Sequence, residues 1–90
     1  MNLQNKVTIP SHVLANQIDD EIIILDLASG TYFGLNPIGA QIWGFLREGK
    51  TLAETCQAML QKYDVAPHEI EHDVVNLITT LLSKNLVQLH

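Results

Sequence analysis

The sequence predicts an α+β fold in which a three-stranded antiparallel sheet is followed by three helices. Two observations support this prediction. The first third of the chain contains short runs rich in β-branched and aromatic residues, separated by turn residues. The remainder contains apolar residues three and four positions apart, between residue types that begin and end helices. We expect one domain over residues 1–90, because a chain of this length can build a single core.

The three strands are predicted at 13–18, 21–27 and 31–35. The pair Asp19-Asp20 suits a turn between the first two strands. Gly30, which adopts a positive φ without strain, suits the turn before the third. Because these connections are short, neighbouring strands must run antiparallel. Such a small sheet needs cover on one face, which the helices must supply.

The three helices are predicted at 37–47, 52–63 and 67–83. Asn36 can cap the first helix, with Pro37 at its first position. Thr51 and Glu54 have the spacing of a capping box at the start of the second. The third begins with acidic residues, which the helix dipole favours, and ends before Lys84-Asn85. A short terminal strand is expected within 87–89.

Composition and charge exclude several classes of protein. The hydrophobic content of 47% and the charged content of 17% argue against a disordered chain. Five Lys and Arg against ten Asp and Glu give a formal charge of −5, and the basic residues are scattered, which argues against nucleic-acid binding. Cys56 is the only cysteine, so no internal disulfide or Cys-based zinc site can form. We see no secretory signal or membrane-spanning run, and therefore expect a cytoplasmic protein without membrane contact.

No group of residues predicts catalysis, a metal or a cofactor. Residues 68–72 (HEIEH) match the zinc-peptidase pattern H-E-x-x-H. Such an enzyme also needs a third ligand and a substrate cleft in a larger fold, whereas the other histidines, His12 and His90, lie near the termini. Cys56 lies on an apolar helical stripe with no evident base. We therefore expect a non-catalytic protein with no metal and no cofactor.

A series of spaced motifs runs through the chain. A strand ending in Leu-Asp-Leu is followed by a small-residue turn with Gly30, an aromatic strand ending in Leu-Asn, and a helix with Gly39 and Trp43. Further on come D-V-x-x-L-I-x-x-L from Asp73 and N-L-V at 85–87. Together these motifs resemble the PqqD-like family, over about residues 13–89. The family usually has G-L-V at the last motif, and Asn, like Gly, tolerates the left-handed conformation there.

The resemblance implies a winged-helix-like fold with no catalytic activity. Members of this family bind the leader segment of a ribosomally made precursor peptide and deliver the peptide to a modifying enzyme or leader protease. Since the chain runs from Met1 to just past the last element, we expect the free-standing form, as in lasso-peptide pathways. Other pathways pair such a protein with a radical enzyme. The net negative charge leads us to expect basic residues in the leader.

The predicted third strand is suited to accept an added peptide strand, because it contains no protective Lys or Pro. Gly34 allows a close backbone approach, and the third helix offers a second wall with polar residues above apolar ones. Val75 and Leu82 are an alternative lining for that wall. The predicted peptide-binding residues are Thr31, Tyr32, Phe33, Gly34, Leu35, Asp73, Val74, Asn76, Leu77 and Thr80.

Two other functions compete with this hypothesis. The second and third helices have the order of a helix-turn-helix, so the chain could be a winged-helix nucleic-acid-binding module. Acidic residues at the start of the third helix argue against that function, because they would repel phosphate. An unprotected edge strand also invites self-pairing, so a dimerisation module is the other alternative. We expect a monomer or an edge-strand dimer.

Overall fold

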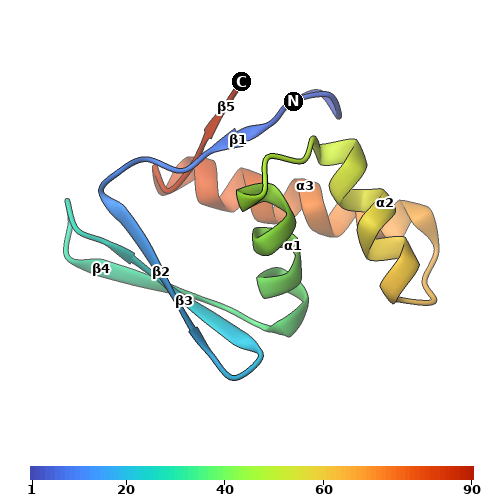
Figure 1. The fold of residues 1–90 in the computed structure, drawn as a ribbon. Coiled ribbons are helices and arrows are strands. Elements are labelled where there is room, and N and C mark those ends of the chain that lie inside the picture. Colours follow the sequence, from blue (N-terminus) through green and yellow to red (C-terminus); the bar gives the residue numbers. More distant parts are fainter.

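A computed structural model describes residues 1–90, and it has the predicted order of sheet and helices (Figure 1). None of the helices is both long and apolar enough to cross a membrane. The elements are β1 (Val7–Thr8), β2 (Val13–Ile18), β3 (Glu21–Asp26), β4 (Thr31–Leu35), α1 (Pro37–Arg47), α2 (Leu52–Lys62), α3 (Pro67–Ser83) and β5 (Gln88–Leu89).

The main sheet is antiparallel, with strand order β2-β3-β4. Asp19 adopts a positive φ of 56° in the turn between β2 and β3, and Gly30 has a φ of 74° before β4. The predicted strand over 21–27 ends one residue early, at Asp26. Both oxygens of the Asp26 carboxylate are taken up by the turn, accepting from the Ala28 N–H and the Ser29 hydroxyl, each at 2.9 Å. The chain therefore turns at Leu27 instead of extending the strand.

The helices begin at the caps that the sequence predicts. The Asn36 side chain accepts from the Gly39 N–H at 2.8 Å, and Thr51 and Glu54 form a reciprocal capping box. The helix predicted over 52–63 ends one residue early, at Lys62, because Tyr63 has an extended backbone. Asn85 adopts a left-handed φ of 58° after α3, the conformation in which Asn can replace Gly.

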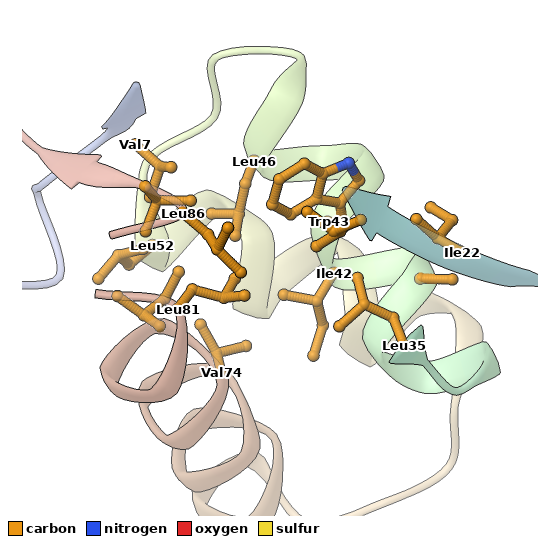
Figure 2. Packing of buried hydrophobic residues seen from close by; sticks show 14 of the residues in the cluster. Val7, Ile22, Leu35, Ile42, Trp43, Leu46, Leu52, Val74, Leu81 and Leu86 are labelled. Carbon is orange, nitrogen blue, oxygen red and sulfur yellow. The ribbon is translucent and has the colours of Figure 1, made fainter. Parts of the chain in front are cut away.

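The core lies between the inner face of the sheet and the three helices (Figure 2). Ile22 and Ile24 of β3 share this face with Leu35 of β4, since the register pairs Ile22 with Leu35 and Ile24 with Phe33. Ile42 and Trp43 of α1 lie at the centre of the cluster, each 1% exposed. The outer face of the sheet has no such cover, and Leu14, Ile18 and Tyr32 are exposed there.

A two-stranded ribbon, β1 with β5, brings the two ends of the chain together (Figure 1). No sequence pattern predicts β1, because a two-residue strand has no periodicity. The segment before it also holds the start of α2. Leu52 and Ala53 donate their backbone N–H groups to the carbonyls of Asn5 and Leu3, at 2.9 and 2.8 Å. These donors have no partner within the helix, so the N-terminal segment completes the helix cap.

Candidate functional site

The third strand of the sheet, β4, has one unpaired edge, and its register determines which backbone groups lie there. Leu27 donates its N–H to the His12 carbonyl at 2.8 Å, and Gly30 donates to the Asp26 carbonyl at 2.8 Å. Consecutive residues of a strand direct these groups to opposite sides. The β3 residues that hydrogen-bond to β4 are therefore Ile22, Ile24 and Asp26, and their partners are the odd-numbered residues of β4. The N–H and C=O groups of Tyr32 and Gly34 are left at the free edge.

The side chains of β4 are divided between the two faces of the sheet. Leu35 is buried and Phe33 is half-buried on the inner face, where both meet the helices. Tyr32 is 76% exposed on the outer face, and Thr31 and Gly34 are exposed as well. A ligand strand at this edge would thus meet apolar surface on both faces.

A hollow of about 300 Å³ lies next to the end of β4, between the start of α1 and α3. Three of the predicted site residues, Asp73, Asn76 and Leu77, line it from α3. The opposite side is formed by residues that the sequence analysis did not predict: Asn36, Ile38, Gly39 and Ile42. In the sequence, the Asn-Pro start of α1 indicates a helix cap and gives no signal of a binding surface. A Cβ at Gly39 would lie 3.4 Å from Asn36 Oδ1, so this glycine keeps the helix start closely packed.

The predicted residues of α3 do not all reach this hollow. Asp73, Asn76, Leu77 and Thr80 share one face of the helix, because Asn76 and Leu77 lie three and four residues after Asp73, and Thr80 lies four and three residues after them. Val74 is 0% exposed and belongs to the core, so it is not open to a ligand. Val75 and Leu82, the alternative lining, are not among the residues that surround the hollow.

The polar rim of the hollow has donors and acceptors to offer. Asn76 Nδ2 donates to His72 Nε2 at 2.9 Å, which orients the amide and leaves its oxygen available. Asp73 is exposed, and the one ion pair of the structure joins His12 and Asp26 elsewhere. The first half of α3 presents three exposed carboxylates, those of Glu69, Glu71 and Asp73. This surface is unsuited to the phosphates of a nucleic acid.

The structure shows no arrangement typical of catalysis. No three His, Cys, Asp or Glu side chains gather closely enough to hold a metal ion, His68 and His72 included. Burial raises the pKa of the Cys56 thiol, which disfavours the reactive thiolate. Strand β4 and the hollow contain no histidine, cysteine or lysine. The side chains that line the hollow offer hydrogen bonds, apolar contact and the carboxylate charge of Asp73.

The other free edge of the sheet, on β2, is partly occupied. Val13 already donates its N–H to the Pro10 carbonyl at 3.1 Å, and the Gln17 side chain bonds to the Asp19 carbonyl at 3.1 Å. A hollow of about 450 Å³ between β2 and α1 is mainly apolar, and Arg47 is its one charged residue. Alternation leaves the backbone groups of Ala15 unpaired at this edge, so it serves as an internal control for the β4 edge.

Two solved structures are similar to nearly the whole chain. The chain is similar to a solved structure described as TbiB1 in complex with the TbiA(beta) leader peptide, with 38% identity and a TM-score of 0.85 over 89% of this chain and 93% of that one. It is also similar to a lasso peptide synthetase B1 complexed with the leader peptide, with 26% identity and a TM-score of 0.85 over 92% and 98% of the two chains. No curated protein sequence matches the chain.

A family model also matches well over half of the chain. The model describes coenzyme PQQ synthesis protein D, and it matches residues 21–87, from the start of β3 to the residue before β5. The matched region contains β4, α1 and α3, the three elements that surround the hollow. The chain therefore belongs to the PqqD family.

Proposed function

We propose that this protein binds the leader segment of a ribosomally made precursor peptide as a fourth strand on β4. It then delivers the peptide to a modifying enzyme or a leader protease. One observation carries the proposal: Tyr32 and Gly34 offer two N–H and two C=O groups at an open edge, next to a hollow with a polar rim. Added strands gain affinity from such main-chain hydrogen bonds and specificity from the neighbouring pockets.

Each site residue then has a defined part in binding. Tyr32 and Gly34 pair with the leader backbone, while Phe33 and Leu35 hold β4 against the core. Leu77 and Ile42 receive an apolar leader side chain in the hollow. Asp73 and Asn76 provide polar contacts along the rim, and Thr80 provides one beyond the hollow on the same face of α3. Thr31 ends the paired stretch near the turn. Two similar structures that contain leader peptides support leader binding by this chain.

The proposed role requires no chemistry from this chain. The site offers hydrogen bonds and apolar surface, and the only cysteine has a raised pKa. We therefore propose an adaptor that works without a metal or cofactor and leaves catalysis to its partner. Ribosomal synthesis of the precursor suggests that this adaptor meets it in the cytoplasm.

A titration with the TbiA(beta) leader peptide tests the proposal, because that peptide binds a protein 38% identical to this one. Calorimetry measures the affinity, and amide shifts recorded during the titration locate the site. We expect saturable binding, with the largest amide shifts at residues 31–35 and at the α3 residues that line the hollow. Shifts confined to β2, or no binding, would overturn the assignment of the site.

The same open edge also supports a second candidate function, self-association. The unpaired groups of Tyr32 and Gly34 can pair with those of a second copy as readily as with a peptide. Light scattering over a range of concentrations distinguishes the two functions. A dimer that dissociates when leader is added uses the β4 edge, whereas one unaffected by leader uses another surface.

A further inference from the structure

Two charges without an ion-pair partner lie along one face of α3, one within the first half of the helix and one just after its last residue. Asp73 and Lys84 are eleven positions apart, which places them within about 20° of each other around the helix axis. Along the axis they are separated by about 16 Å, at 1.5 Å per residue. Neither takes part in an ion pair. Leu77 and Thr80 lie between them on the same face, and neither carries a charge.

The two charges lie at different places along β4. Lys84 Nζ is 5.4 Å from the centroid of the Phe33 ring, so the end of α3 lies beside the middle of the strand. Asp73 shares the hollow with Asn36, which follows the last residue of β4. The strand and the helix therefore run in opposite directions. Residues 31–36 carry no charge, so the polarity of the groove comes from α3.

Helix stability alone does not account for both charges. Lys84 follows the last turn, where a positive charge favours the dipole. Asp73 is the seventh residue of α3, beyond the first turn in which the dipole favours an acid. Glu69 already occupies that first turn. The position of Asp73 is better explained by what lies in front of it, which is the hollow beside β4.

We propose that this polarity selects leaders with a basic residue followed, four positions downstream, by an acidic residue. The proposal rests on the proposed function. Every strand pair in the sheet is antiparallel, so we take the leader to run antiparallel to β4 and parallel to α3. Its upstream end then meets Asp73 and its downstream end meets Lys84.

The spacing follows from strand geometry. Side chains an even number of positions apart point to the same face, and both charges must face α3. Four positions span about 13.5 Å, slightly less than the 16 Å along the helix. The Lys84 side chain accounts for the difference, because it extends to Phe33 in the middle of β4.

The test uses synthetic variants of the TbiA(beta) leader peptide. In the parent peptide, every charged residue of the bound stretch is replaced by Gln. Two further peptides place Lys and Glu four positions apart in either order, so their compositions are identical. We expect the Lys-first peptide to bind about three- to tenfold more tightly than the Glu-first peptide in low salt, with the difference much reduced at high salt.

The double variant Asp73→Lys/Lys84→Glu is the matched control, because it keeps the net charge and reverses the polarity. Its preference should be inverted, towards the Glu-first peptide. Equal affinities for both orders, or a preference that the double variant leaves unchanged, would overturn the inference while the proposed function stands. Failure of the unmodified TbiA(beta) leader peptide to bind would overturn the proposed function itself. If the double variant unfolds, Asp73→Asn and Lys84→Gln should each reduce the preference, and no reduction in either would contradict the inference.

Discussion

Gly34 of β4 faces the side chain of Ile23 on the neighbouring strand: a Cβ placed on Gly34 would lie 3.6 Å from Ile23 Cδ1. That is an ordinary contact distance, so this position accepts alanine without strain. The N–H of Gly34 points to the free edge and is not needed by β3. The amide and the side-chain position can thus be altered independently.

Replacing the amide of Gly34 should abolish one leader hydrogen bond while the sheet remains intact. We expect Gly34→Pro to weaken leader binding at least tenfold, because the variant lacks a donor and its ring obstructs the approaching strand. Gly34→Ala keeps the donor and should bind within about twofold of wild type. Calorimetry measures both affinities. Equal weakening by the two variants would mean that bulk, and not the lost N–H, is responsible.

Substitutions at two positions on neighbouring turns of α3 should affect stability and leader binding separately. Val74 is 0% exposed, so Val74→Ala should lower the unfolding free energy by about 2 kcal/mol and affect affinity little. Leu77 lines the hollow, so Leu77→Ala should weaken leader binding about tenfold at a smaller cost in stability. Urea denaturation and calorimetry on the same samples test this pair. The opposite pattern would place the leader elsewhere.

The Asp26 carboxylate makes stability depend on pH. The hydrogen bond that the Asp26 carboxylate accepts from the Ser29 hydroxyl holds the pKa of Asp26 below its usual 3.8. Backbone hydrogen bonds and the nearby His12 also lower this pKa. A carboxylate whose pKa is lowered by folding stabilises the protein at pH values above its ordinary pKa. This stabilisation is lost as the pH falls through the lowered pKa of the folded state. Asp26→Asn should therefore be less stable than wild type at pH 6.

Urea denaturation of both proteins from pH 6 down to about pH 3 measures this effect. The difference between wild type and Asp26→Asn should narrow as the pH falls. The control variant Asp20→Asn removes an exposed carboxylate from the other turn and should show little difference at any pH. A constant deficit for Asp26→Asn would mean that the carboxylate charge has no part in the turn.

Trp43 is 1% exposed, and its indole Nε1 has no hydrogen-bond partner. An unpaired buried donor costs about 1–3 kcal/mol, so Trp43→Phe removes a penalty along with some apolar contact. We expect Trp43→Phe to change the unfolding free energy by about 1 kcal/mol or less, whereas Trp43→Ala should lower it by about 3–5 kcal/mol. Circular dichroism in urea measures both, since the variants lack the only tryptophan. A large loss for Trp43→Phe would show that the N–H is satisfied in solution.

The sequence predicted the elements of this fold more completely than the site. Capping signals depend on nearby residues only, and those in the sequence all appear as expected: Asn36, the pair Thr51 and Glu54, and Asn85. The inner face of β3 does not follow from alternation, because residues 22–25 are all apolar; the structure buries Ile22 and Ile24 there. The ribbon of β1 and β5 joins residues 7 and 89, and no local pattern predicts so distant a pair.

For the site, periodicity correctly grouped Asp73, Asn76 and Leu77 on one face of α3. It did not separate Val74, which is only one position away from Asp73 but turned towards the core. It also missed Ile38 and Ile42, because their part in the hollow depends on how α1 packs beside α3. Faces of a helix follow from its sequence, whereas the partner of each face depends on tertiary packing.

Amide hydrogen exchange tests the central claim, that a leader adds to β4, most directly. In the free protein, the amides of Tyr32 and Gly34 should exchange rapidly, as should that of Ala15 on the opposite edge. Saturation with the TbiA(beta) leader peptide should slow exchange at Tyr32 and Gly34 and leave Ala15 unchanged. Binding without protection at Tyr32 and Gly34, or with protection at Ala15 instead, would contradict strand addition at β4.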